Sequence, residues 1–173
     1  MSPIRIVMLG CMGVGKSTII VQLVINRFLE LYDPTIEDTY RTRISIDREA
    51  VLIEVVDTVS AYEYPGCYDK YIKSSDGFVI VYSITSYSSF VDADFYRKEV
   101  YNAFDGNFSK HIPIVLCGNK CDLEFERQVC TIYAKNVVDE WKILFYETSA
   151  KNNTNITEMF QVLVEDIKEK KQY

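Results

Sequence analysis

The sequence predicts an α/β domain with a mostly parallel sheet. Short apolar runs of strand length alternate along the chain with longer segments in which apolar and polar residues mix at helical spacing. The 173 residues, 48% of them hydrophobic and 25% charged, fit a single domain over residues 1–173. Because ligands of parallel sheets bind at the carboxyl ends of the strands, we expect the functional residues directly after the apolar runs.

The expected elements follow one another from the N-terminus. The apolar run 4–9 predicts a buried strand, and apolar residues at helical spacing predict a helix over 15–26. Two runs on either side of Asp47-Arg48, 40–46 and 51–56, predict a hairpin. The other predicted strands are 78–82, 112–116 and 143–146, and the other predicted helices are 88–104, 129–141 and 156–170.

Charge and rare residues exclude several classes of protein. The net charge of −6 disfavours a nucleic-acid-binding surface, so a bound phosphate needs a local, shaped site. One histidine, His111, is too few for a structural zinc site or a Ser-His-Asp hydrolase. Five cysteines without a signal peptide predict reduced thiols and a cytoplasmic location. No apolar stretch approaches the roughly 20 residues that span a bilayer.

The octapeptide 10–17, Gly-Cys-Met-Gly-Val-Gly-Lys-Ser, matches the pattern G-x-x-x-x-G-K-[ST] between a predicted strand and a predicted helix. Glycines let successive backbone N–H groups point inward at the positive end of that helix, where they bind phosphate. Lys16 can reach the terminal phosphates, and the hydroxyl of Ser17 can ligate Mg²⁺. The segment predicts a phosphate-binding loop, but kinases, ATPases and GTPases all use such a loop.

The segment Asn119-Lys120-Cys121-Asp122 follows a predicted strand and identifies the base. The carboxylate of Asp122 can accept hydrogen bonds from the ring N–H and the exocyclic amino group of guanine. Adenine offers no such pair of donors on that edge, so this position discriminates between the two purines. With no arginine-rich lid segment in the chain, these residues disfavour a nucleotide kinase.

Asp57 ends an apolar run beside the phosphate loop. A carboxylate at that place is repelled by phosphate unless a cation lies between them, which predicts a Mg²⁺ site. A helix cap is the alternative interpretation of Asp57.

Together these segments resemble the Ras-like small GTPases over essentially the whole chain. The segment 32–40 resembles the effector loop of Ras and Rap proteins, and Asp57-Thr58 stands where the family has D-T-A-G-Q-E. The segment 147–151, Glu-Thr-Ser-Ala-Lys, looks like the base loop of the family. The resemblance implies a P-loop NTPase fold with a six-stranded, mostly parallel sheet flanked by five helices.

The resemblance also implies a nucleotide-dependent switch. Thr35 would ligate Mg²⁺ and touch the γ-phosphate, Asp57 would hold the metal through water, and Phe28 would stack on guanine. A plain turn residue is the alternative for Thr35. The implied nucleotide-binding residues are Met12, Gly13, Val14, Gly15, Lys16, Ser17, Thr18, Phe28, Tyr32, Pro34, Thr35, Asn119, Lys120, Asp122, Ser149, Ala150 and Lys151, with Ser17, Thr35 and Asp57 as metal ligands and Lys16, Thr35, Ser60 and Ala61 at the catalytic step.

Three residues differ from the family pattern at positions that take part in GTP hydrolysis. Ser60, after Val59, replaces the glycine that donates an N–H to the γ-phosphate. Ala61 replaces the glutamine that positions the attacking water, and a methyl group cannot hydrogen-bond to water. Met12 replaces a glycine and would occupy the space of an arginine finger, which contributes about 10³–10⁵-fold in Ras itself.

These departures predict slow GTP hydrolysis and poor stimulation by activating proteins. Tyr62 or Tyr64 positioning the water is one alternative. A pseudo-GTPase that does not hydrolyse GTP and serves as an interaction module is another.

Two segments predict protein partners. The tyrosine-rich segment 62–71 is either a partner surface or packs on the third helix of the domain, and Pro65-Gly66 should shift the start of any helix there towards Cys67. An exchange factor is expected. Effectors are expected to bind the first switch through Tyr32, Asp33, Ile36, Glu37, Asp38, Thr39 and Tyr40.

A lipid anchor is the remaining question that the sequence raises. No cysteine follows Cys130, so the C-a-a-X anchor of Ras relatives is not in this chain. A location at the inner face of a membrane is expected only for a longer, lipidated chain.

Overall fold

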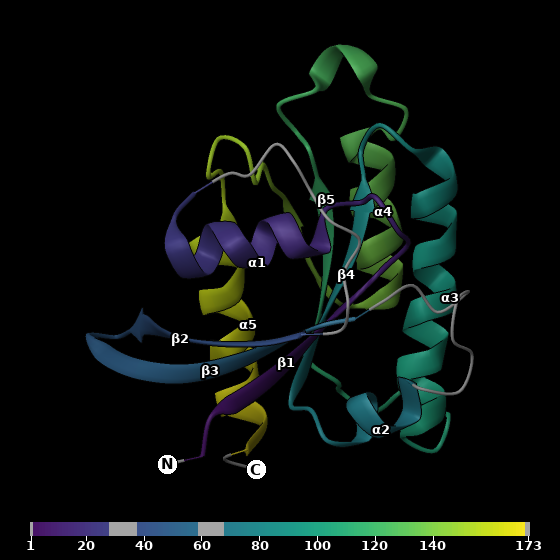
Figure 1. Cartoon of the computed structure of the whole chain (residues 1–173). Coiled ribbons are helices and arrows are strands. Elements are labelled where there is room, and N and C mark those ends of the chain that lie inside the picture. Colours follow the sequence, from purple (N-terminus) through teal and green to yellow (C-terminus); the bar gives the residue numbers. More distant parts are fainter. Residues whose placement is uncertain (1, 28–37, 59–67, 172–173) are drawn as a thin grey trace.

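The computed structural model describes residues 2–27, 38–58 and 68–171, which form one six-stranded sheet with helices on both faces (Figure 1). The strand order is β2-β3-β1-β4-β5-β6, and only the pairing of β2 with β3 is antiparallel. The strands are β1 (Ile4–Leu9), β2 (Asp38–Ile46), β3 (Glu49–Asp57), β4 (Gly77–Ser83), β5 (Ile114–Asn119) and β6 (Leu144–Glu147). The helices are α1 (Lys16–Ile25), α2 (Tyr68–Lys73), α3 (Tyr87–Ala103), α4 (Thr131–Trp141) and α5 (Ile156–Lys171), with a short 3₁₀ turn η1 (Glu124–Glu126). The predicted fold class is confirmed.

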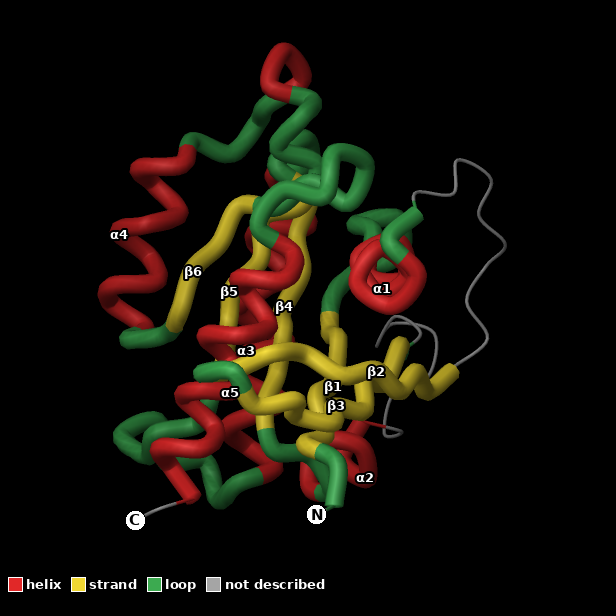
Figure 2. The backbone as a smooth tube through the Cα atoms, turned by 90° about the vertical axis from the view of Figure 1, so that its left-hand side faces the viewer, coloured by secondary structure: helices red, strands yellow, loops and turns green. Residues whose placement is uncertain are grey.

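The two faces of the sheet are covered by different helices: Figure 1 shows α1 and α5 on one side of the strands and α3 and α4 on the other, and Figure 2, turned by 90°, shows β4, β5 and β6 side by side. In β1, Ile6 and Met8 pack in the layer of α1 and α5, whereas Val7 and Leu9 pack in the layer of α2, α3 and α4. A strand buried on both sides reads as a continuous apolar run rather than as an alternating pattern. This explains why the run 4–9 is apolar at nearly every position.

Two elements begin two residues later than the sequence predicts, each for a physical reason. β5 begins at Ile114 rather than at residue 112, since Pro113 has no N–H to give to the sheet. α4 begins at Thr131 rather than at residue 129, because the N–H groups of Gln128 and Val129 both donate to the carbonyl of Ile84. The predicted hairpin is present, and its two turn residues adopt positive φ angles of 48° and 68°, as a twisted two-residue turn requires.

The parallel pairing places three loops at one edge of the sheet. β3, β1, β4 and β5 lie next to one another in that order, so the chain after β1, the end of β3 and the chain after β5 meet at their carboxyl ends. Within the described residues, no helix is long and apolar enough to cross a membrane.

Candidate functional site

The loop after β1 closes tightly around two glycines. Gly10 has φ 143° and Gly15 has φ 101°, values that a residue with a Cβ rarely adopts. A Cβ at Gly10 would collide with the carbonyl oxygen of Val81 in β4, and one at Gly15 would collide with the side-chain amide of Asn119. Glycine is therefore required at both positions because the loop packs closely against β4 and β5. The sequence motif did not predict the contact of Gly10 with β4.

Lys16, the first residue of α1, lies folded over this loop. Its ammonium donates to the carbonyl oxygens of Gly10 at 2.9 Å and Cys11 at 3.1 Å, and the side chain is largely buried. Gly15, at the N-cap, has no side chain to bond to the first turn of the helix. The loop therefore presents a positive charge and a helix N-terminus together, which is the arrangement that binds phosphate.

Asp57, at the end of β3, is fully buried and meets the first turn of α1. One carboxylate oxygen accepts a hydrogen bond from the hydroxyl of Ser17. The other has no hydrogen-bond partner among the residues that the structure describes. Burial raises the pKa of Asp57 above its ordinary value. A buried carboxylate beside a hydroxyl is a fitting pair of oxygen ligands for Mg²⁺.

Asn119, at the end of β5, connects the phosphate loop to the segment 147–151. Its amide nitrogen donates to the carbonyl oxygen of Val14 at 3.0 Å. Its amide oxygen accepts from the hydroxyl of Thr148 at 3.2 Å and from the N–H of Ala150 at 3.4 Å. Asn119 thus braces two loops against each other. Thr148, which the sequence analysis did not single out, is part of that brace.

The next residues place a carboxylate and a lysine beside the loop. The ammonium of Lys120 donates to the carbonyl oxygen of Gly13 at 2.8 Å. The hydroxyl of Ser149 donates to one oxygen of Asp122 at 2.6 Å and accepts from the N–H of Asn152 at 3.0 Å. The orientation of the Asp122 carboxylate is therefore fixed through its first oxygen, and its second oxygen is not used by Ser149.

Met12 and Cys11 lie on the side of the loop that faces α3. The side chain of Met12 is 71% exposed at the rim of a cavity of about 210 Å³ between the loop and the start of α3. The thiol of Cys11 donates to Asp92 of α3 at 3.1 Å. Burial, aided by Asp92, raises the pKa of Cys11 to about 11, so this thiol stays protonated at neutral pH.

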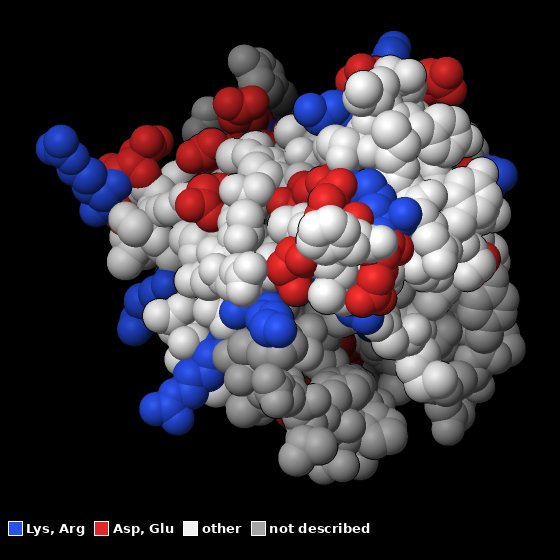
Figure 3. All heavy atoms as spheres, turned by 90° about the horizontal axis from the view of Figure 1, so that it is seen from above, with Lys and Arg blue, Asp and Glu red and all other residues white. Residues whose placement is uncertain are grey.

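Seen from the end at which η1 projects, acidic side chains gather in the middle of the face, with some basic ones between them (Figure 3). The acidic residues of η1, Glu124 and Glu126, are exposed there. Such a face does not attract polyanions in general. A phosphate group bound at this end would therefore depend on the local geometry around Lys16, as the sequence analysis expects.

The structure brings together most of the predicted site residues that it describes: the loop residues 12–18, Asp57, and the residues of 119–122 and 149–151. Asp38, Thr39 and Tyr40 lie at the start of β2, which is an edge strand of the sheet. The following predicted residues lie outside the described residues: Phe28, Tyr32, Asp33, Pro34, Thr35, Ile36, Glu37, Ser60, Ala61, Tyr62 and Tyr64.

The loop after β1, the buried carboxylate of Asp57 and the segment 119–122 lie at one edge of the sheet, and the chain belongs to the Ras family, whose family model matches residues 5–169. It is therefore a GTP-binding small GTPase. A similar protein, Ras-like protein 2 of Mucor circinelloides f. lusitanicus, is 39% identical over 168 residues, covering 97% of this chain and 83% of that protein. The resemblance inferred from the sequence is confirmed.

Proposed function

We propose that this small GTPase binds GTP or GDP together with Mg²⁺, hydrolyses GTP slowly and responds poorly to activating proteins. The observation that carries the proposal is Ala61: a methyl group stands where the family has the glutamine that orients the attacking water. The exposed side chain of Met12 supports the second part, because an arginine finger has to enter beside it. Binding and hydrolysis are thereby uncoupled, since the substitutions leave Lys16 and Asp122 in place.

The residues of the site have separate tasks in this proposal. Lys16 and the N–H groups at the start of α1 bind the phosphates, and Asp122 accepts hydrogen bonds from guanine. Ser17, Asp57 and Thr35 hold Mg²⁺, which supplies charge neutralisation of the phosphates when bound. One buried oxygen of Asp57 has no hydrogen-bond partner among the described residues, which supports that assignment.

Effector binding is proposed for the first switch. β2 is an edge strand, with Asp38 and Thr39 exposed at its start. An extended segment of a partner can pair with such an edge through backbone hydrogen bonds. The chain of residues 32–37 leads directly into it. An exchange factor completes the proposed set of partners.

A single-turnover assay tests the hydrolysis proposal. The purified chain is loaded with GTP, and phosphate release is followed with and without an activating protein, beside an ordinary Ras protein. We expect slower release from this chain and little stimulation. Hydrolysis as fast and as strongly stimulated as in the Ras control would contradict the proposal.

The second candidate, a pseudo-GTPase, is favoured by the clustering of Met12, Ser60 and Ala61 on one chemical step. It is distinguished by analysing the nucleotide that copurifies with the chain. A pseudo-GTPase would carry one nucleotide that neither exchanges nor is cleaved, whereas the proposed slow GTPase exchanges added GDP and converts GTP over hours.

A further inference from the structure

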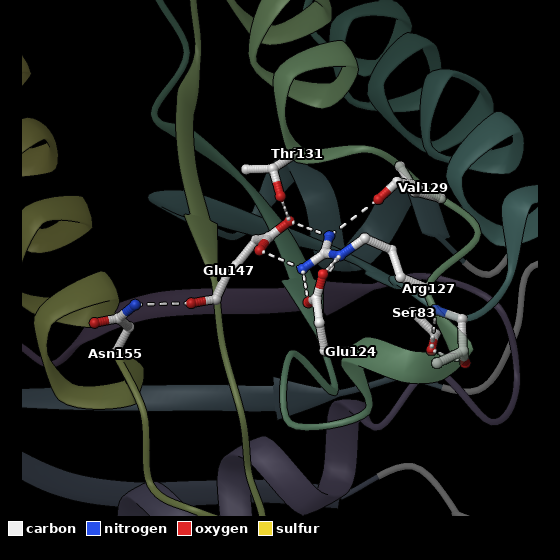
Figure 4. A network of polar contacts seen from close by, with 8 residues as sticks. Ser83, Glu124, Arg127, Val129, Thr131, Glu147 and Asn155 are labelled. Carbon is white, nitrogen blue, oxygen red and sulfur yellow. Dashed lines mark hydrogen bonds and ion pairs between the residues drawn. The ribbon is translucent and has the colours of Figure 1, made fainter.

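Arg127 lies at the centre of a network of charged side chains next to the segment 147–151 (Figure 4). Two of its nitrogens donate to the two carboxylate oxygens of Glu147, at 2.7 and 2.9 Å. Its Nε donates to both oxygens of Glu124 at 2.9 Å, and one terminal nitrogen donates to the same carboxylate at 2.7 Å. The other terminal nitrogen also donates to the carbonyl oxygen of Val129 at 3.0 Å. Such paired bonds from a planar guanidinium fix a carboxylate in direction as well as in distance.

The two carboxylates in this network differ in their exposure. The side chains of Arg127 and Glu147 are 16% and 17% exposed, whereas that of Glu124 is 65% exposed. Hydrogen bonds to Glu147 and then to Glu124 raise the pKa of Arg127, so its charge is permanent. The inner pair is sheltered from water and is therefore the stronger of the two, while the outer pair is screened by solvent.

Glu147 is held from further directions. The hydroxyl of Thr131, at the start of α4, donates to its carboxylate at 2.9 Å. The side-chain amide of Asn155 donates to its backbone carbonyl at 2.8 Å. Both the side chain and the main chain of Glu147, the last residue of β6, are thus held by hydrogen bonds from outside the sheet.

The network continues into the residues that are proposed to bind guanine. Thr148 follows Glu147 and donates to Asn119, which braces the phosphate loop. Ser149 comes next and donates to Asp122. A displacement of Glu147 would therefore reach the Asp122 carboxylate through two residues of chain and one hydrogen bond.

We propose that Arg127 is a positioning residue for guanine-nucleotide retention: by anchoring Glu147 it holds the segment 147–151 in place and slows nucleotide dissociation. Glu124 is the outer, solvent-exposed partner and contributes less. This inference rests on the proposed guanine-binding role of Asp122 and concerns the lifetime of the complex, not the chemistry of hydrolysis.

The test is the dissociation rate of a fluorescent GDP from the full chain in excess unlabelled GDP and Mg²⁺. We expect Arg127→Ala to accelerate dissociation about tenfold, which corresponds to about 1.4 kcal/mol. Arg127→Lys should recover part of the effect, because an ammonium is a point charge that cannot make the paired bonds. Glu147→Gln, which nearly keeps the shape of the side chain, should accelerate dissociation like Arg127→Ala.

Arg97→Ala is a matched control for a merely structural effect. The Arg97 side chain is 13% exposed and donates to Asp94 at 2.7 Å. Its Cζ lies 4.6 Å from the ring centroid of Trp141, which is the last residue of α4, whereas Thr131 is the first. We expect both Arg97→Ala and Arg127→Ala to lower the melting temperature, but we expect Arg97→Ala to leave the GDP dissociation rate within about twofold of the parent.

Three outcomes would overturn this inference. Equal dissociation rates for Arg127→Ala and Arg97→Ala, with normal retention by the parent, would overturn it and leave the proposed function standing. If Arg127→Ala does not fold, an unchanged rate in Glu147→Gln overturns it in the same way. A parent that retains no guanine nucleotide would instead overturn the proposed function, and this inference with it.

Discussion

Replacing Gly15 by alanine puts a methyl group into the contact between the phosphate loop and Asn119 of β5. The backbone there has φ 101°, which costs a residue with a Cβ roughly 1–2 kcal/mol. The methyl carbon would also collide with the Asn119 amide and lie 2.8 Å from the hydroxyl of Thr18. Asn119 is 1% exposed, so losing its bond to Val14 leaves a buried polar group unpaired, at about 1–3 kcal/mol. The two effects together destabilise the chain by roughly 2–5 kcal/mol.

Gly13→Ala is the matched comparison. Gly13 has φ 81°, but a Cβ there meets nothing within 4 Å, so only the backbone cost of roughly 1–2 kcal/mol remains. Urea unfolding of the parent and both variants without nucleotide measures the difference directly. We expect Gly15→Ala to be the less stable variant by at least about 1 kcal/mol. Equal free energies of unfolding would refute the reasoning from the Asn119 contact.

Three further predictions use other residues of the site. The first concerns Asp57 without metal, in EDTA: its raised pKa means that the folded state binds the carboxyl proton more tightly than the unfolded state does. The protonated Asp57 therefore stabilises the fold fully below the unfolded pKa of 3.8, and this contribution to the free energy of unfolding is lost as the pH rises through the folded pKa. Asp57→Asn should remove this pH dependence in urea unfolding, and an unchanged profile would contradict the assignment. Iodoacetamide at pH 7.5 should modify the exposed Cys130 at least about tenfold faster than Cys11, whose pKa is about 11; similar rates in peptide mass spectrometry would refute this. Asn119→Ala should lower the melting temperature by roughly 4–10 °C, because three hydrogen bonds between two loops are lost, and a shift below about 1 °C would argue against the brace.

The fold and the phosphate loop could be predicted because their signals are local in the sequence. The apolar run 4–9, Gly10 and the helical spacing after Lys16 stand next to one another, and each has one physical interpretation. The turn at Asp47-Arg48 is local in the same sense. By contrast, β5 and α4 began two residues later than predicted, since a proline and the carbonyl of Ile84 decide those boundaries.

The contacts that hold the site together could not be predicted, because they join residues far apart in the chain. The bond from Asn119 to Val14 spans 105 residues, and its existence depends on the strand order. Arg127 and Glu147 are 20 residues apart and meet only because β6 pairs with β5 while the chain before α4 turns back towards it. The sequence motif predicts that Asn119 binds the nucleotide, and the structure adds that Asn119 links the phosphate loop to the segment 147–151.

The uncoupling of binding from hydrolysis is tested most directly by restoring the lost polar group. Single-turnover GTP hydrolysis is measured for the parent and for Ala61→Gln, with GTP affinity measured for both. We expect affinities within about threefold and hydrolysis at least roughly tenfold faster in Ala61→Gln, since a side chain that can orient water is again present. Equal hydrolysis rates at equal affinity would show that residue 61 does not limit turnover and would contradict the account.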